Sequence, residues 1–490
     1  MKKSYLLCAA LLASTMLSAQ DAFWSVTNYK GAFPVTDNTP ATDWTSGWSN
    51  FDPENTVYPA TTTTASTDIT TNTTWSGVVL LQNKVYVKNN ATLTIAPGTI
   101  IRGDKLTQAT LIITRGAKIN ANATASNPIV FTSNEAVGSR NEGDWGGLVI
   151  LGKAQVNQTN PAIEGINPPV IYGGTDDADN SGILKYVRVE YAGIELTPNN
   201  ETNSITLGGV GIGTVMEYCQ ASYGGDDGFE LFGGTINGKY LISLGMWDDD
   251  YDIDFGYRGK IQFALAVRYP TFADQSGSNI VETDNGPNDN VTTLVTNGVI
   301  TNLTAIGPRL TNTQVVNANY QHSIDMRRRT ALTIANSVFV GMTRGIRMNQ
   351  QSVFDNYNSG AGLLLNNIMS APAATFTVGT GMTATATSVQ NYWNANGNVT
   401  IAGTDFETPT TGIYNTLGLN LNIFYGSSTQ NFYSFNPTFE VTSGTLTTGA
   451  SFTNPKLTDA FFTPTTYRGA FGSTDWTATW TEFVPNLKAY

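Results

Sequence analysis

The sequence has very few of the residue types on which many enzymes and metal sites depend. Among 490 residues there are two cysteines and one histidine, and only 13% of the residues are charged. Cys8 lies in the apolar N-terminal segment, so Cys219 is the one cysteine of the remaining chain, which excludes an internal disulfide there. A histidine-rich zinc site is excluded, and a Ser/His/Asp triad would need His322.

Basic side chains are also scarce. Lysine and arginine number 26 against 38 acidic residues, which gives a formal net charge of −12. This balance argues against nucleic acid and anionic lipid surfaces as partners and favours cation binding. Beyond the N-terminal segment, no apolar run approaches the roughly 20 residues of a membrane-spanning helix. We therefore expect no transmembrane segment.

The first 19 residues are typical of an export signal. Residues 1–3 are basic at two positions, residues 5–17 are apolar, and Ala19 is a small residue suited to cleavage before Gln20. Cys8 follows two leucines where a lipid-attachment site has small residues, so we expect no lipid anchor. The protein is predicted to be exported and extracellular or at the cell surface, with the periplasm as the alternative.

Short β-rich runs follow one another from about residue 78, separated by Gly, Asn and Asp, which predicts an all-β chain. Two acidic segments match at an offset of 22 residues: 225–234 (GDDGFELFGG) and 247–256 (WDDDYDIDFG). Acids align with acids and apolar residues with apolar residues, as in coils of a solenoid whose like residues stack. The same step aligns Cys219 with Leu241 and Phe263, which predicts an inward-facing apolar position.

Both ends of the chain carry the same aromatic motif. Residues 29–33 (YKGAF) precede DWTxxWxxFxP at 43–53, and residues 467–471 (YRGAF) precede the same pattern at 475–485. The spacing of Trp, Trp and Phe predicts a short helix with Asp43 or Asp475 as its N-cap. We expect each motif to cover an end coil or to dock against its twin; the alternative is an aromatic sugar-binding platform.

The predicted organisation has five parts. A signal peptide at 1–19 is followed by an N-terminal cap and linker at 20–76 and by stacked coils at 77–355. The region 356–455 is almost uncharged and rich in Thr and Asn, so it forms either further coils or an inserted β lobe. The C-terminal cap motif occupies 456–490.

Several segments resemble right-handed parallel β-helix proteins of the pectin-lyase-like type. The resemblance begins with residues 97–101 (PGTII), 127–133 (NPIVFTS) and 143–148 (GDWGGL), and continues through 172–284, which is similar to exported Gram-negative β-helix proteins of mostly unassigned activity. It covers about residues 77–350. It implies a right-handed parallel β-helix. Together with the 22-residue repeat and the terminal motifs, the predicted fold is an all-β solenoid with coils of about 22 residues and aromatic terminal caps. Function stays open, because this fold carries lyases, hydrolases, adhesins and inert surface proteins alike.

An acidic ladder is the main candidate site. Strand alternation would place Asp248, Asp250, Asp252 and Asp254 on one face, with Asp226, Asp227 and Glu230 one coil away and Asp249 beside them. Carboxylates at strand spacing repel one another unless a cation or a proton relieves them, and oxygen-rich sites suit Ca²⁺. We predict that this ladder binds Ca²⁺. The alternative is a solvated acidic face paired with Lys239, Arg258 or Lys260.

Two smaller constellations are weaker candidates. Asp177 and Asp179 begin a D-x-D-x-S-G loop like the first half of a calcium loop, without its final glutamate, so a plain turn is the alternative. Arg327 and Arg329 would share a strand face about three coils from Asp254. These arginines could bind the carboxylates of an acidic polysaccharide, or they could pair with Asp325 and neighbouring acids.

The sequence favours an exported, non-catalytic scaffold that binds a glycan or a surface protein and is stabilised by Ca²⁺. The alternative is a polysaccharide-active enzyme. A lyase would use Ca²⁺ on the ladder with Arg258 or Lys260 as base, whereas a hydrolase would use two carboxylates as acid and base. A third interpretation is an accessory role in an outer-membrane complex.

Overall fold

The computed structural model describes residues 23–34, 43–45, 49, 51–52, 57–197, 200–370, 374–420, 424–425, 432–433 and 437–490. The predicted signal peptide at 1–19 lies outside these residues, as do Trp48 and Pro53 of the N-terminal motif. The chain divides into a small unit, residues 1–57, and a large unit, residues 58–490. In the described part of the chain, no helix combines the length and the apolar character needed to cross a bilayer.

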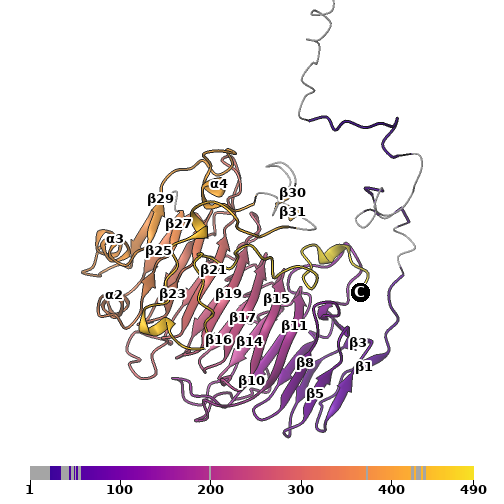
Figure 1. Cartoon of the computed structure of the whole chain (residues 1–490). Coiled ribbons are helices and arrows are strands. Elements are labelled where there is room, and N and C mark those ends of the chain that lie inside the picture. Colours follow the sequence, from indigo (N-terminus) through magenta and orange to yellow (C-terminus); the bar gives the residue numbers. More distant parts are fainter. Residues whose placement is uncertain are drawn as a thin grey trace, which may run out of the picture. The chain divides into compact units, whose positions relative to one another are not determined.

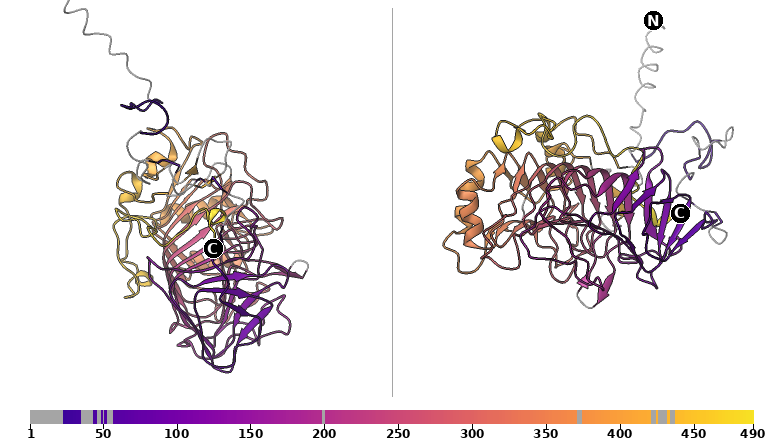
Figure 2. Two further views of the ribbon diagram at one scale, coloured as in Figure 1. Left: turned by 90° about the vertical axis from the view of Figure 1, so that its right-hand side faces the viewer. Right: turned by 90° about the horizontal axis from the view of Figure 1, so that it is seen from below.

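The large unit is a right-handed parallel β-helix, as predicted (Figures 1 and 2). One of its sheets takes one strand from each successive coil, and every pair of neighbouring strands in it is parallel. Its strands are β4 (Lys84–Val87), β7 (Thr110–Ile113), β10 (Leu148–Leu151), β14 (Ile205–Gly208), β16 (Phe229–Phe232), β18 (Tyr251–Asp254), β20 (Val281–Thr283), β22 (His322–Met326), β25 (Arg344–Met348) and β28 (Ala374–Val378).

The second sheet has short strands at its ends and long, bent strands in the middle. The first coils contribute two rows, β1 (Thr63–Ala65), β3 (Val78–Leu81), β6 (Ile100–Gly103) and β9 (Ile129–Ser133), and β2 (Thr73–Trp75), β5 (Thr92–Ile95) and β8 (Lys118–Asn122). The rows merge in β11 (Gly182–Glu190), β15 (Val215–Ser222), β17 (Asn237–Leu244), β19 (Lys260–Val267) and β21 (Val299–Ile306). They separate again into β23 (Thr333–Ala335) with β26 (Leu364–Leu365), and β24 (Val338–Val340) with β27 (Ile368–Ser370) and β29 (Val399–Ile401).

The 22-residue repeat is confirmed between β16 and β18. Phe229 pairs with Tyr251 and Glu230 with Asp252. Other coils are longer, because chain segments between the strands differ in length; Val281, for example, pairs with Ile324, 43 residues later. Cys219 is fully buried in the core, as predicted. Beyond Leu241, however, its column continues with Ala264 and not with Phe263.

Each long strand bends at a residue with positive φ. These residues form one column, with φ between 51° and 60°: Tyr186, Tyr218, Tyr240, Phe263, Asn302, Asn336 and Asn366. For a residue with a bulky side chain this conformation costs about 1–2 kcal/mol. In the aromatic ladder formed by the first four, neighbouring rings stack with centroids 4.4–5.2 Å apart. Ring stacking of this kind contributes about 0.5–1.5 kcal/mol per pair and offsets much of that strain.

The coils extend beyond the predicted range of 77–355. They begin at β1 and continue to β29, and the helices α2 (Gln351–Asn358) and α3 (Ala386–Ala395) lie between the last strands. Val353, Tyr357, Val389 and Trp393 of these helices are buried in the same core as the coil interiors. The two helices therefore close the apolar interior at the end where the coils stop.

Beyond β29, the described residues of 402–490 leave the coils and cover the outer face of the long strands. Outward residues such as Ile242, Leu265 and Val338 form one buried cluster with Tyr414 and Phe471 from this region. Its regular elements are short: α4 (Ile413–Leu417), the 3-10 turns η3 (Thr445–Thr447), η4 (Pro455–Leu457) and η5 (Pro485–Leu487), and the strands β30 (Phe424–Tyr425) and β31 (Phe432–Tyr433). A further small hairpin, β12 (Glu195–Thr197) and β13 (Asn200–Glu201), projects from an earlier coil.

The C-terminal aromatic motif does not cover an end coil. Trp480 packs edge-on against Tyr186 and Tyr218, and Trp476 against Tyr240, so the motif lies along the side of the β-helix. The chain forms a turn at 476–480, not the predicted helix. Asp475 nevertheless accepts the Thr477 backbone N–H (2.8 Å) in the manner of an N-cap. The lateral position follows from the ladder, whose stacked rings offer Trp476 and Trp480 an aromatic surface.

Candidate cation site

The acidic segments meet on the outer face of the sheet that contains β16, β18 and β20. The strand register stacks Glu230, Asp252 and Glu282 in one column. The flanking residues Phe229 and Tyr251 point into the core, where both are buried and their rings stack. Because parallel strands lie about 4.8 Å apart, these carboxylates become close neighbours although they are distant in the chain.

A second column of Asn and Asp side chains occupies the turns just before these strands. Asn203 accepts the Asp227 backbone N–H (3.3 Å), and Asp227 accepts that of Asp249 (2.8 Å). Asp249 in turn accepts the N–H of Asn279, which accepts that of His322 (3.0 Å). Asparagine satisfies this pattern at both ends of the column. The backbone hydrogen bonds of this column therefore need only one side-chain oxygen from each residue, and the negative charge of Asp227 and Asp249 is additional to them.

Two groups of three carboxylates form around Asp227. One contains Asp226, Asp227 and Asp248, and the other contains Asp227, Glu230 and Asp252. Within each group, one oxygen from every residue lies within 4.8 Å of the others. Oδ1 of Asp248 and Oδ1 of Asp252 are buried and have no hydrogen-bond partner among the described residues. These five residues are called the acidic cluster below.

The surroundings of the acidic cluster disfavour negative charge. Burial, reinforced by repulsion from neighbouring carboxylates, raises the pKa of all five carboxyl groups well above the usual range. On the edge of the cluster, burial and then the neighbouring Asp284 raise the pKa of Asp254 to about 8. At neutral pH the cluster must therefore hold either protons or a cation.

The basic residues predicted to pair with the ladder have other partners. The Lys239 ammonium lies 4.8 Å from the centroid of the Phe461 ring. The Lys260 ammonium forms an ion pair with Asp459 (3.1 Å) on the C-terminal segment. Arg258 binds both oxygens of Asp177 (2.8 and 2.9 Å). None of these three residues neutralises the acidic cluster.

Asp177 and Asp179, which begin the predicted calcium loop, make separate contacts. Hydrogen bonding to Arg258 holds the pKa of the Asp177 carboxyl below its usual value. Asp179 is buried and accepts the Ser181 hydroxyl (3.0 Å). Among the described residues, neither aspartate belongs to a group of three potential ligands. The two alternating aspartates therefore stabilise separate contacts and do not converge.

Asp250 and Asp249 also differ from the prediction. The strand begins at Tyr251, so Asp250 does not continue the outward alternation of Asp252 and Asp254. Asp250 is fully buried, accepts the Ser243 hydroxyl (2.6 Å) and forms an ion pair with buried Arg268 (3.3 Å). Asp249 lies beside the cluster but belongs to neither triad.

The arginine segment lies closer to the acids than predicted. Arg327 follows β22, two strands from β18, because the intervening coils are long. Arg327 binds Glu282 and Asp284 (3.2 Å to the latter), and Arg328 also binds Asp284. Positive φ values at Arg328 and Arg329 end the extended conformation, so Arg327 and Arg329 do not share a strand face. Arg329 turns away and donates to the Asp289 carbonyl (2.9 Å).

Sequence reasoning missed two acids on the next coil, Glu282 in β20 and Asp284 directly after it. Residues 281–284 (VETD) repeat the pattern of 251–254 (YDID), but the offset here is 30 residues. A search with a variable coil length would have found this match. The partners of the Asn/Asp column, Asn203 and Asn279, give no comparable signal, because asparagine is common in turns.

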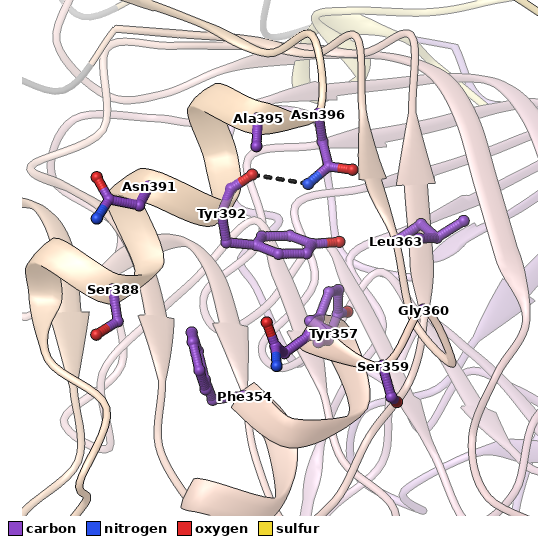
Figure 3. Close-up of a pocket in the computed structure, with 11 residues that line it drawn as sticks. Phe354, Tyr357, Ser359, Gly360, Leu363, Ser388, Asn391, Tyr392, Ala395 and Asn396 are labelled. Atoms are coloured by element: carbon purple, nitrogen blue, oxygen red, sulfur yellow. Dashed lines mark hydrogen bonds between the residues drawn. The ribbon is translucent and has the colours of Figure 1, made fainter.

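A separate pocket of about 660 Å³ lies between α2 and α3. Figure 3 shows the aromatic side chains of Phe354, Tyr357 and Tyr392 around it, with Asn391 and Ser388 on one side. No acidic or basic residue is among its lining residues. This pocket therefore offers aromatic rings, amides and hydroxyl groups but no carboxylate, lysine or arginine.

Comparison with known protein families identifies a related family. A family model described as a pectate-lyase like beta helix domain matches residues 61–414. No curated protein and no solved structure shows significant similarity to the chain. The matched range begins near β1 and ends in α4, so it spans all the coils.

Proposed function

The chain belongs to the pectate-lyase-like β-helix domain family, and from this premise we propose that it is an exported, non-catalytic scaffold whose acidic cluster binds Ca²⁺. The scaffold is extracellular or on the cell surface, with the periplasm or an outer-membrane complex as alternative settings. Its partner is a glycan or a surface protein.

The observation that carries the proposal is the pair of carboxylate triads that share Asp227. Ca²⁺ takes six to eight oxygen ligands in flexible geometry, and carboxylates, backbone carbonyls and water all serve. The buried oxygens of Asp248 and Asp252 that lack a hydrogen-bond donor are suited to a cation. Binding there would replace repulsion between neighbouring coils by attraction, and so stiffen the solenoid.

The ion pairs that the basic residues form favour a scaffold over a lyase. A lyase needs an uncharged or easily deprotonated base beside the substrate. Arg258 and Lys260, the predicted bases, form ion pairs with Asp177 and Asp459. Arg327, the basic residue nearest the acidic column, binds two carboxylates. Each arrangement stabilises the positive charge and opposes proton removal.

One observation favours the hydrolase alternative. The pKa of Asp254 is raised to about 8, and a carboxyl that stays protonated at neutral pH can act as a general acid. Asp284 beside it would be the second carboxylate of such a pair. An activity assay therefore belongs in the test of function.

The pocket between α2 and α3 is the better candidate for a glycan than the predicted arginine surface. Arg327 and Arg329 are engaged with acids or carbonyls of their own chain. The pocket instead presents the half-buried rings of Phe354 and Tyr392 and the exposed amide of Asn391. An uncharged lining with aromatic rings and amides suits a neutral sugar, which combines apolar ring faces with hydroxyl groups.

Calcium titration by calorimetry tests the cation site. EDTA-treated protein is expected to bind Ca²⁺ with a heat signal and a raised melting temperature. Asp227→Asn removes the shared ligand and should abolish both. Asp249→Asn is the matched control: it changes the adjacent position of the same column, keeps the acceptor oxygen and touches neither triad. Absence of any heat or thermal shift at millimolar Ca²⁺ would refute the site.

Incubation with glycans tests whether the protein binds a glycan and whether it cleaves one. Pectate, alginate and neutral glycans are offered with and without Ca²⁺, and products are followed by ultraviolet absorbance and by reducing ends. The scaffold predicts retardation in an affinity gel without turnover, weakened by Phe354→Ala. New unsaturated products or new reducing ends that disappear in Asp254→Asn would establish the enzyme instead.

A further inference from the structure

The two triads of the acidic cluster are distinct groups of oxygens. Asp226 and Asp248 belong to the first triad, Glu230 and Asp252 belong to the second, and Asp227 belongs to both. Inside each triad the ligand oxygens lie within 4.8 Å of one another. Opposite oxygens around one Ca²⁺ lie about 4.6–5.2 Å apart, because each oxygen is about 2.3–2.6 Å from the ion. Each triad therefore has the span of one calcium coordination shell, whereas among the described residues all five carboxylates together do not form one such group.

Each triad contains a buried oxygen that lacks a hydrogen-bond donor. In the first triad this atom is Oδ1 of Asp248, and in the second it is Oδ1 of Asp252; neither atom has a partner in the described part of the chain. A buried acceptor without a donor is unfavourable, and more so when it carries charge. Because the two atoms belong to different triads, a single cation bound in one triad leaves the buried oxygen of the other without a partner.

The shared residue, Asp227, has the capacity to serve two cations. It lies in the turn before β16, and its Oδ1 accepts the backbone N–H of Asp249 (2.8 Å). An ionised carboxylate offers about four lone-pair sites on its two oxygens. The hydrogen bond to Asp249 uses one of these sites, so the carboxylate of Asp227 can still bind an ion in each triad.

The charge of the acidic cluster also favours two divalent cations. Its five ionised carboxylates carry a charge of −5, which one Ca²⁺ reduces to −3 and two reduce to −1. The arginines nearest to the cluster have other partners, since Arg268 pairs with Asp250 and Arg327 pairs with Glu282. In the described part of the chain, no basic side chain forms an ion pair with the cluster. Buried negative charge without a counter-charge is unfavourable, so a second ion compensates what the first leaves.

We propose that the acidic cluster binds two Ca²⁺ ions, one in each triad, and that Asp227 bridges them. This inference rests on the proposed calcium-binding function and adds a second ion and the shared ligand. Asp226, Asp227 and Glu230 belong to the coil of β16. Asp248 and Asp252 belong to the coil of β18, so both ions join the same two coils. Three carboxylates do not fill a shell of about six to eight oxygens, so backbone carbonyls or water complete each shell.

Counting the bound ions tests the proposal. Native mass spectrometry and calorimetry of the EDTA-treated full chain with Ca²⁺ are expected to give two ions per chain. Asp226→Asn and Asp248→Asn each remove a ligand of the first triad alone. Glu230→Gln and Asp252→Asn each remove a ligand of the second triad alone. Each of these four variants should bind its affected ion about tenfold or more weakly, so that one ion remains at a Ca²⁺ concentration that just saturates the unaltered protein. Asp227→Asn should remove both ions.

Two variants of each triad protect the result against a local change of structure in either one, and melting curves in EDTA show that each variant is folded. Asp249→Asn is the control, because Asp249 lies beside the cluster and belongs to neither triad; it should keep both ions. One ion in the unaltered protein, or loss of both ions in a variant of a single triad, would overturn the second site and leave the proposed calcium-binding function standing. No ion in the unaltered protein would refute both.

Discussion

Two aspartates only two residues apart should respond to the same substitution with opposite sign. Asp252 lies among like charges in the acidic cluster, whereas Asp250 is the counter-ion of buried Arg268. The ligand oxygens of each triad lie within 4.8 Å of one another, and two full charges at that upper limit repel by about 3.5 kcal/mol at an effective dielectric constant of 20. Partial protonation relieves some of this repulsion, so Asp252→Asn should stabilise the calcium-free protein by about 1–3 kcal/mol at pH 8.

Asp250→Asn removes charge from a different environment. Arg268 is fully buried, and its guanidinium also lies 5.0 Å from the centroid of the Tyr320 ring. Loss of its counter-ion leaves an uncompensated buried cation, which costs about 3–5 kcal/mol. Asp250 has a pKa of about 6, so it is ionised at pH 8 and the full effect is expected there.

Thermal unfolding in EDTA and in 1 mM Ca²⁺ at pH 8 measures both effects. In EDTA, Asp252→Asn should raise the melting temperature by a few degrees and Asp250→Asn should lower it. Calcium should then stabilise Asp250→Asn as much as the unaltered protein, and Asp252→Asn much less. If both substitutions lower the melting temperature in EDTA, the acidic cluster is not under repulsive strain and the electrostatic reasoning is wrong.

Three further predictions concern pH and the lateral contacts. Carboxyl groups whose folded pKa lies above the unfolded value of about 4 bind more protons in the folded state. The calcium-free protein should therefore lose stability as the pH rises from 5 to 8, the range up to the pKa of Asp254. Thermal unfolding across this pH range measures the loss. Calcium should reverse this slope, because it competes with those protons; a flat profile would contradict a buried acidic cluster. Trp480→Ala should destabilise the protein by about 3–5 kcal/mol in denaturant unfolding, because it removes a buried ring from Tyr186 and Tyr218. Asp177→Ala should lower stability, because Asp177 binds Arg258, and should leave calcium binding measured by calorimetry unchanged. Loss of calcium binding in this variant would instead support the predicted calcium loop at Asp177.

The sequence predicted the site best where two coils have equal length. The segments around Glu230 and Asp252 have no insertion between them, so one offset gave the correct register. The prediction failed for Asp250 because period-two alternation was extended into a turn. It also failed for Arg258, whose partner Asp177 lies 81 residues earlier in the chain. Ion pairs between coils depend on the path that each loop takes between its strands. The spacing of residues along the chain carries no information about these paths.

The acidic cluster is better explained by ligand binding than by the needs of the fold. In the turn column, Asn203 and Asn279 make the same hydrogen bonds as Asp227 and Asp249, with one side-chain oxygen accepting the next backbone N–H. Asparagine at position 227 would therefore maintain the stack without charge. Asp227 is instead the one residue that the two triads share. A charge that raises the free energy of the folded protein, at the one residue common to two groups of oxygens, is what the proposed cation site would explain.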